Sequence, residues 1–175
     1  MLKKTLFNED YIFKGSQCEK VIKLTSPIDN NSPAIFQTSI DLFIFASLVG
    51  VIKNRKSKPE KERGQSTTKI FLNQFSSHSV DLELVYKMIL LTCKMEYPEP
   101  EARLGKAFRN PDLDENYKLF EEYMLGGLDE IYERVFVDSN RNFEDYLTSI
   151  NELLNDLTSE SNNDVVADLG NEDFF

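Results

Sequence analysis

The sequence predicts a mainly α-helical, compact single domain of five to seven helices, with room for a short β-hairpin. Three observations predict it. Hydrophobic residues make up 41% of the chain and aromatic residues 11%, which is enough apolar material for a core and argues against a wholly disordered chain. Several segments carry apolar residues at helical spacing. Glycine (7) and proline (6) are too few for a low-complexity or collagen-like chain.

A length of 175 residues corresponds to about one domain. We expect residues 1–157 to form the helical domain and residues 158–175 to form a flexible acidic tail. The most apolar run, Leu42–Ile52, is well short of the ~20 residues that span a bilayer, and no signal-peptide pattern is present. We therefore expect a cytoplasmic protein without membrane contact. Cys18 and Cys93 are isolated and are expected to be reduced, although a disulfide between them is left open.

The first third of the chain gives weak local patterns. Asn8–Gly15 mixes aromatic and acidic residues and predicts a short helix that ends at Gly15. Glu19–Leu24 alternates loosely and predicts a strand. The turn formers of Pro27–Pro33 predict a loop.

The clearest early helix begins at Thr38. Thr38 is a good N-cap, and Asp41 places an acid in the first turn, where it suits the helix dipole. The apolar residues that follow leave no polar face, so we expect this helix to be enclosed on nearly all sides. Gly50, near its end, indicates either a C-terminal cap or close packing.

Two further helical segments are expected in the middle of the chain. Lys69–Leu72 is expected to be a short strand or the approach to a helix that Ser79 caps and that runs to about Lys94. The apolar face of that helix comprises Leu82, Val85, Ile89 and Cys93, widened by Leu84, Met88 and Leu91. Prolines end that helix, and a short helix over Glu101–Phe108 is expected after them.

The C-terminal half predicts two longer helical regions. Asp112–Val137 reads as helical, but Gly126 and Gly127 together cost about 2 kcal/mol relative to alanine, so we expect a kink or a tight turn there. The last helix has a clean apolar stripe from Phe143 to Leu157, with Asn142 as its N-cap.

Charge is divided unevenly between the two halves. Residues 1–94 carry 14 basic and 9 acidic residues, whereas residues 95–175 carry 6 and 21. Either the halves present opposite fields to partners, or they face each other and neutralise one another in part. Residues 53–64 are expected to be an exposed basic loop, whose six cations are Lys53, Arg55, Lys56, Lys58, Lys61 and Arg63.

Nothing in the sequence predicts a catalytic residue, a metal site or a cofactor. His78 is the single histidine, so any Ser-His-Asp or Cys-His mechanism would need it, and its serine-rich surroundings indicate a helix-entry loop instead. The glycines form no phosphate-binding fingerprint. The acid pairs Glu121–Glu122 and Asp129–Glu130 are interpreted as solvated acids on helix faces.

Two segments are candidate binding elements. The basic loop can contact DNA phosphates, but it lacks interleaved aromatics and a recognition helix, so a solvated loop or a docking patch for an acidic partner is the other interpretation. The acidic tail either keeps the chain soluble or docks its aromatic end into a pocket of a partner. The candidate partner-binding residues of the tail are Glu172, Asp173, Phe174 and Phe175.

Two stretches resemble segments of one protein family. Thr38–Gly50, followed by the basic Lys53–Lys56, is similar to an "aspartate, apolar, phenylalanine, x, phenylalanine, alanine … glycine" segment. Glu121–Ile131 is similar to a "glutamate-tyrosine … glycine-leucine" segment. Both resemble the small accessory proteins encoded beside bacterial DNA-phosphorothioation (Dnd-type) and related phage-defence genes. The resemblance implies a non-catalytic subunit that works with a larger ATPase or nuclease, in which Gly50, Gly126 and Gly127 are packing and turn positions.

The function expected from the sequence is therefore that of an accessory or bridging subunit of a bacterial antiphage complex, docking through the basic loop and an acidic helical face. The first alternative is a DNA-binding regulatory module that uses Lys53 to Arg63. A third interpretation is a Mg²⁺-dependent nuclease that uses acids of the C-terminal half.

Overall fold

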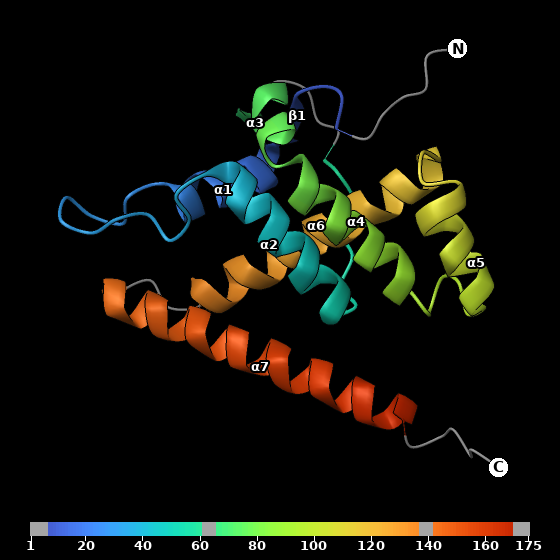
Figure 1. Cartoon of the computed structure of the whole chain (residues 1–175). Helices are drawn as coiled ribbons and strands as arrows, with labels where there is room; N and C mark the ends of the chain where they lie inside the picture. Colours follow the sequence, from blue (N-terminus) through green and yellow to red (C-terminus); the bar gives the residue numbers. More distant parts are fainter. Residues whose placement is uncertain (1–6, 61–65, 137–141, 170–175) are drawn as a thin grey trace.

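The apolar helix α2 (Ser39–Ile52) and the amphipathic helix α6 (Asp114–Val135) cross at the centre of the molecule and make the most extensive helix–helix contact of the described chain (Figure 1). The computed structural model describes residues 7–60, 66–136 and 142–169, with side chains of the last helix described as far as Ser159. The remaining elements are β1 (Tyr11–Lys14), α1 (Gly15–Thr25), β2 (Thr67–Ile70), α3 (Leu72–Ser77), α4 (Ser79–Thr92), α5 (Pro100–Leu104), the π-helical turn η1 (Gly105–Arg109) and α7 (Phe143–Leu169).

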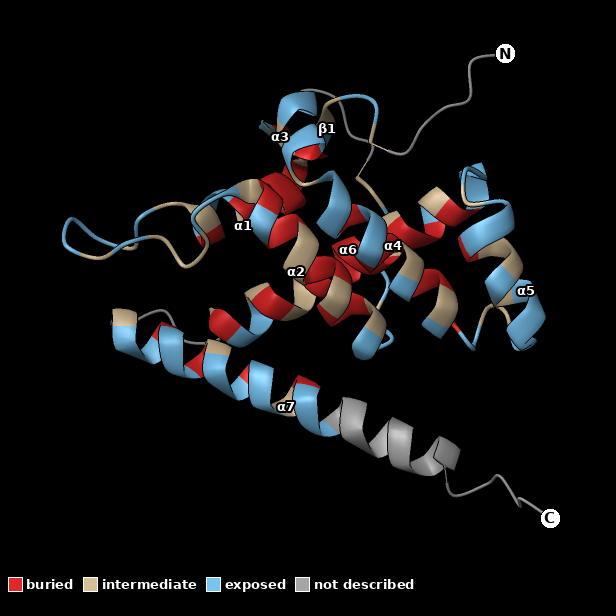
Figure 2. Cartoon of the chain, in the orientation of Figure 1, coloured by how far each residue is buried: buried red, intermediate tan, exposed pale blue. Residues whose placement is uncertain are grey.

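The predicted fold class is confirmed. Over the described residues the chain is mainly helical, with α1 to α7 and one two-stranded antiparallel sheet. The two strands are joined by long-range pairing, in which Tyr11 lies opposite Ile70 and Lys14 lies opposite Thr67. Helices α1, α4 and α7 pack around the α2–α6 pair, and Figure 2 shows that buried residues concentrate where α2 and α6 cross.

Two predictions for the first 25 residues are wrong. The segment expected to be a helix up to Gly15 contains strand β1, and Glu19–Leu24, expected to be a strand, lies within helix α1. The partner of β1 comes more than fifty residues later in the chain, so the local pattern does not reveal the pairing. In α1, the buried residues Cys18, Val21 and Leu24 recur every three residues, which is a helical spacing.

Between these two elements the backbone turns at Gly15. Its φ of 55° lies in the left-handed region that side chains disfavour. The backbone therefore changes from strand to helix at this one glycine.

Helix α2 begins as predicted. The Thr38 hydroxyl accepts a hydrogen bond from the Asp41 backbone N–H at 3.2 Å, and it donates one to the Asp41 carboxylate at 2.6 Å. The loop predicted around Pro27–Pro33 is present as well, and the helix is buried or half-buried along most of its surface. The C-cap of α2 is Lys53, so Gly50 is a packing position and not a cap.

The two adjacent glycines do not interrupt α6, which is one continuous helix, and the predicted kink or turn is wrong. A Cβ atom at Gly127 would lie 1.8 Å from the Ala46 carbonyl oxygen of α2, and one at Gly50 would lie 1.8 Å from the Tyr123 carbonyl oxygen of α6. The two helix backbones therefore touch where neither has a side chain. Tertiary packing outweighs the local cost of glycine in a helix.

The middle and end of the chain follow the predictions with smaller differences. His78 is the N-cap of α4 and Ser79 its first residue, while a short helix α3 precedes it. The helix expected near Glu101–Phe108 is present as α5 and η1. Asn142 caps α7 as expected, because its side chain accepts from the Asp145 N–H at 3.0 Å. We expected this helix to end near Leu157, but its backbone remains helical to Leu169.

We predict that Gly127→Ala destabilises the fold by about 3 kcal/mol or more, because the new methyl group meets backbone atoms that cannot move without separating α2 from α6. Urea unfolding of the purified variant measures this loss.

Gly105→Ala is the matched control for this substitution. No heavy atom lies within 4 Å of its added Cβ, and its backbone is helical. Alanine there should leave stability unchanged or raise it by up to about 1 kcal/mol. Equal stability of Gly127→Ala and the wild type would contradict the packing role of this glycine.

Candidate functional site

The described part of the predicted basic loop lies against the protein body. We call residues 53–60 the strap. Arg55 donates two hydrogen bonds to the two carboxylate oxygens of Glu133, at 2.7 and 2.6 Å, and one to Glu130 at 2.7 Å. These bonds, with burial opposing them, raise the pKa of Arg55. Its guanidinium is therefore occupied by two acids of α6.

Other residues fasten the strap to its neighbours. Lys56 pairs with Glu96, whose second oxygen accepts from the Tyr123 hydroxyl at 2.9 Å. The Lys58 carbonyl accepts from the Gln17 side chain at 2.8 Å, while the Lys58 side chain is exposed. A Cβ atom at Gly126 would lie 2.0 Å from the Arg55 carbonyl oxygen, so the strap backbone also rests directly on α6.

The remaining cations of the predicted basic loop either lie at the end of α2 or fall outside the described residues. Lys53 is the C-cap residue of α2 and is half-buried. Lys61 and Arg63 lie outside the described residues, as do the tail residues Glu172, Asp173, Phe174 and Phe175. The predicted loop is thus only partly described, and two of its cations, Arg55 and Lys56, have carboxylate partners within the chain.

Two of the four acids that we interpreted as solvated, Asp129 and Glu130, belong to this network. Asp129 accepts from Lys20 at 2.6 Å and also from the Ser57 hydroxyl, and Glu130 pairs with Arg55 and, at 3.2 Å, with Arg134. Both carboxylates are largely buried. Of the two interpretations of the charge asymmetry, partial neutralisation between the halves is the one these pairs support.

The other candidate residues for chemistry have structural positions. His78 joins α3 to α4, and its Nδ1 lies 2.9 Å from the Gln74 carbonyl oxygen. Cys18 and Cys93 are free and buried, and burial raises the pKa of Cys93 to about 11. Among the described residues, no three His, Cys, Asp or Glu side chains are grouped so as to hold a metal ion, and none of the helices there is long and apolar enough to cross a membrane.

A groove of about 400 Å³ runs along β1 and the first turns of α6. Three segments form it: the residues that precede β1, β1 itself, and the stretch from Asp112 into α6. Its aromatic walls are Phe7, Tyr11 and Tyr117. Among the described residues its charged lining is mostly acidic, with the cation Lys14 against Glu9, Asp10, Asp112, Asp114 and Glu121. We call this the acidic groove.

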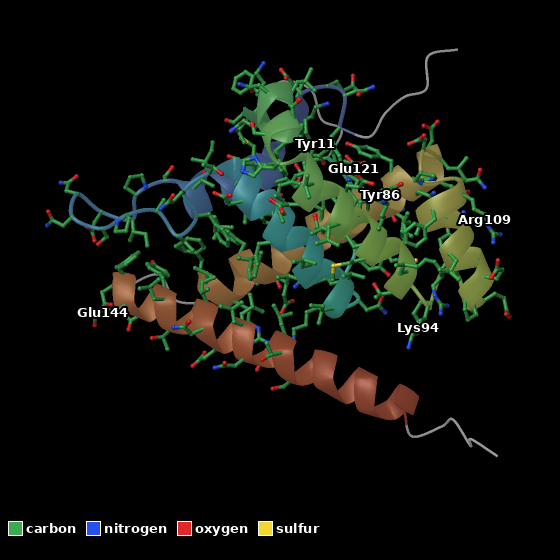
Figure 3. All side chains as sticks on the ribbon, in the orientation of Figure 1. Tyr11, Tyr86, Lys94, Arg109, Glu121 and Glu144 are labelled. Carbon is green, nitrogen blue, oxygen red and sulfur yellow. The ribbon has the colours of Figure 1, made fainter. Side chains whose placement is uncertain are left out.

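Glu121 is the half-buried acid of the acidic groove. The Tyr11 hydroxyl donates a 2.8 Å hydrogen bond to its Oε1, and Figure 3 labels both residues near the β1 end of α6. Burial raises the pKa of Glu121, although the bond from Tyr11 opposes the shift, and the neighbouring Glu122 charge adds to it. An ionised carboxylate there is poorly solvated and would gain from a cation placed beside it.

Asp10, at the edge of the same groove, is already paired. Lys69 donates to one of its oxygens at 2.9 Å, and the Leu72 backbone N–H donates to the other at 2.9 Å. The hydrogen bond from Lys69, followed by that from Leu72, lowers the pKa of Asp10. This carboxylate therefore holds β2 and α3 to the chain before β1, while Glu9, Asp112 and Asp114 are exposed.

A second groove, of about 420 Å³, lies on the other side of Phe7, between α4 and η1. Phe7 lines both grooves and is held by ring contacts with Phe43, Phe75 and Phe120 at centroid distances of 6.1, 5.3 and 5.5 Å. The Tyr86 hydroxyl lines this second groove and donates to the Pro111 carbonyl at 2.6 Å. The Tyr86 hydroxyl is thus already hydrogen-bonded within the chain.

The wide apolar face predicted for α4 is only partly buried. Of the residues expected to widen it, Leu84 and Met88 are exposed and Leu91 is half-buried. The buried side of α4 consists of Leu82, Val85, Tyr86, Ile89 and Leu90. Helix α4 is therefore apolar on two sides, of which the described chain covers one.

Sequence reasoning missed the acidic groove. Its lining comes from segments that are far apart in the sequence, and β1 was expected to be helical. A usable signal was present in Tyr11 and Phe13, which lie on one face of the strand and whose ring centroids are 4.8 Å apart. The exposed Ile12 between them hid this alternation of period two.

The described structure is thus a small helical domain whose two most distinctive surface features are the ion-paired strap and the acidic groove. The sequence matches the family model of DNA sulphur modification system-associated protein 4 over residues 16–169, from α1 through α7. The chain belongs to that family, as the resemblance of its two motifs implied. Searches of curated proteins and of solved structures found no match.

We predict that Glu121→Gln raises the urea midpoint of unfolding at pH 7. Burial raises the pKa of Glu121, so its ionised form opposes folding at neutral pH, whereas glutamine still accepts the bond from Tyr11. This penalty exists above the raised pKa and disappears as the pH falls to the ordinary value of 4.5, where the folded wild type is protonated. The gain over the wild type should therefore shrink from pH 7 to pH 4.5.

Glu9→Gln is the control, because Glu9 lines the same groove but is exposed. Its unfolding midpoint should match the wild type at both pH values. A Glu121→Gln midpoint equal to or below that of the wild type at pH 7 would show that the carboxylate stabilises the fold.

Proposed function

We propose that this protein is a non-catalytic, cytoplasmic accessory subunit that binds a larger protein of the DNA sulphur modification system, an ATPase or a nuclease. The acidic groove is its docking site, and the occupant is a basic segment of the partner that also carries an aromatic or aliphatic side chain. The family ties the chain to such a system. The acidic groove is the observation that carries the docking part of the proposal.

The chemistry of the groove supports a basic occupant. A lysine or arginine side chain in the groove would lie against the rings of Phe7 and Tyr117, which contact each other edge to face, and Glu121 would supply a poorly solvated carboxylate. In the free protein, burial makes the negative charge of Glu121 unfavourable. A cation of the partner placed beside Glu121 would offset that cost, and this gain would contribute to the binding energy. The exposed acids at the rim attract a basic segment before contact.

DNA is a less suitable partner for the surfaces that the structure describes. The net charge of −10 and the acids of the groove repel phosphates. Arg55 and Lys56 would have to leave Glu133, Glu130 and Glu96 to contact a DNA backbone. A protein partner needs no such rearrangement, which is why we place DNA binding through the basic loop second.

The proposal predicts that Glu9→Lys combined with Asp112→Lys reduces recovery of the partner at least tenfold. Both residues are exposed at the groove, so the reversal changes its charge without altering the core. Tagged full-length protein is expressed in its native host and purified together with whatever it binds. Mass spectrometry then identifies and quantifies the recovered proteins of the system.

Glu152→Lys on α7 is the control, since it changes an exposed acid outside the groove. It should leave recovery unchanged. Undiminished recovery with the groove variant would reject the acidic groove as the docking site. Absence of any protein of the system from the wild-type preparation would reject the accessory role itself.

A further inference from the structure

Strand β1 has a neighbouring strand on one side only. It pairs with β2 in a two-stranded antiparallel sheet, so its second edge faces no other strand of the described chain. In an antiparallel pair, every second residue turns its backbone N–H and C=O away from the partner strand. Apart from the pairing with β2, no backbone hydrogen bond among the described residues reaches Tyr11, Ile12 or Phe13. The outward backbone groups of this edge are therefore open to a further strand.

The acidic groove runs along this open edge. Tyr11 and Ile12 are consecutive residues of β1, so their side chains point to opposite faces of the sheet. Both residues nevertheless line the groove, whereas no residue of β2 does. A groove that touches both faces of β1 and leaves β2 untouched lies beside the strand and not above it.

The opposite wall of the groove is formed by the first turns of α6. Asp114, Tyr117 and Glu121 follow one another at spacings of three and four residues, so they share one face of the helix. The hydrogen bond from the Tyr11 hydroxyl to Glu121 joins this wall to β1 (Figure 3). On the face of the sheet that carries Tyr11, a strand added beside β1 would therefore lie against these side chains of α6.

The charge of the groove indicates what kind of strand fits. A second copy of this chain would bring the same acids to the edge, and like charges placed opposite each other disfavour pairing. A segment with lysine or arginine at every second position would direct its cations toward Asp114 and Glu121. The residues between them would point to the other face, where Ile12 is 49% exposed and offers an apolar cross-strand neighbour.

We propose that the occupant of the acidic groove binds as an extended strand that adds to the open edge of β1, with basic residues alternating with aliphatic ones. This inference rests on the proposed function for the place of docking, and it adds the backbone conformation and the sequence pattern of the partner segment. In this mode of recognition, main-chain hydrogen bonds supply affinity and the side chains of alternate residues supply specificity. A third strand also stabilises the sheet, since a pair of strands alone is marginally stable.

The first test titrates the isotope-labelled full-length protein with a capped peptide of about six residues, the usual length of a strand, in which lysine and valine alternate. We expect a dissociation constant of roughly 10 to 1000 µM, with the largest NMR shifts in β1 and at Tyr117 and Glu121. A peptide of the same composition, with its lysines and valines in separate blocks, should bind roughly tenfold more weakly, because its lysines point to both faces.

The second test removes N–H groups from the peptide backbone and leaves the protein unchanged. Two versions of the alternating peptide are made, one N-methylated on the lysines and the other on the valines. The N–H groups of a strand point alternately to its two edges, and the lysine pattern fixes the register. One methylated peptide should therefore bind at least roughly tenfold more weakly than the parent peptide, and the other should bind as the parent does.

Two outcomes would overturn strand addition. Equal binding of the two methylated peptides would show that the segment docks through its side chains alone. Absence of binding by the parent peptide at ~1 mM would show that the edge of β1 does not accept a strand.

The proposed function fails or stands by a separate measurement, which is recovery of the native partner with and without the Glu9→Lys, Asp112→Lys reversal. Loss of the partner in that variant, together with equal binding of the methylated peptides, would leave the groove as the docking site and reject the added strand.

Discussion

The structure depends on the direct backbone contact between α2 and α6. Gly50 and Gly127 remove the two side chains that would keep these helices apart, and Gly126 does the same for the strap one residue earlier. The two adjacent glycines of α6, together with Gly50 of α2, therefore fix the central crossing and the path of residues 53–60. Because the start of α6 also lines the acidic groove, the position of Tyr117 and Glu121 relative to β1 follows from the same contact.

The strap shows how this contact organises charge. The Glu133 carboxylate is exposed and Arg55 is only half-buried, and ion pairs open to water contribute little to stability, so the Arg55–Glu133 pair matters more for where the strap lies than for how stable the fold is. The pairs of Arg55 with Glu130 and Glu133 have a larger effect on the surface. In these pairs, Arg55 of the N-terminal half neutralises acids in the second half of α6. The acids that line the groove are not part of these pairs, so the groove remains negatively charged.

The elements predicted well are those whose evidence is local. Helices α2 and α7 have a cap and an apolar pattern within one stretch, and both begin at the expected residue. The failures have non-local causes. Strand β1 needs a partner far along the chain, and the cost of glycine in α6 is offset only by a helix that the local sequence does not contain. The acidic groove was missed for the same reason, since three separate segments build it.

Helix α4 marks the limit of what sequence patterns alone can assign. Its apolar residues on both sides are visible in the sequence, but the described part of the chain covers only one side. Which side faces inward is decided by α2 and η1, which pack on one side of the helix. The side that remains is therefore not a defect of core packing. It is apolar surface that the described part of the chain leaves uncovered, so the packing of the neighbouring elements, and not the apolar pattern of α4 itself, decides which of its sides is buried.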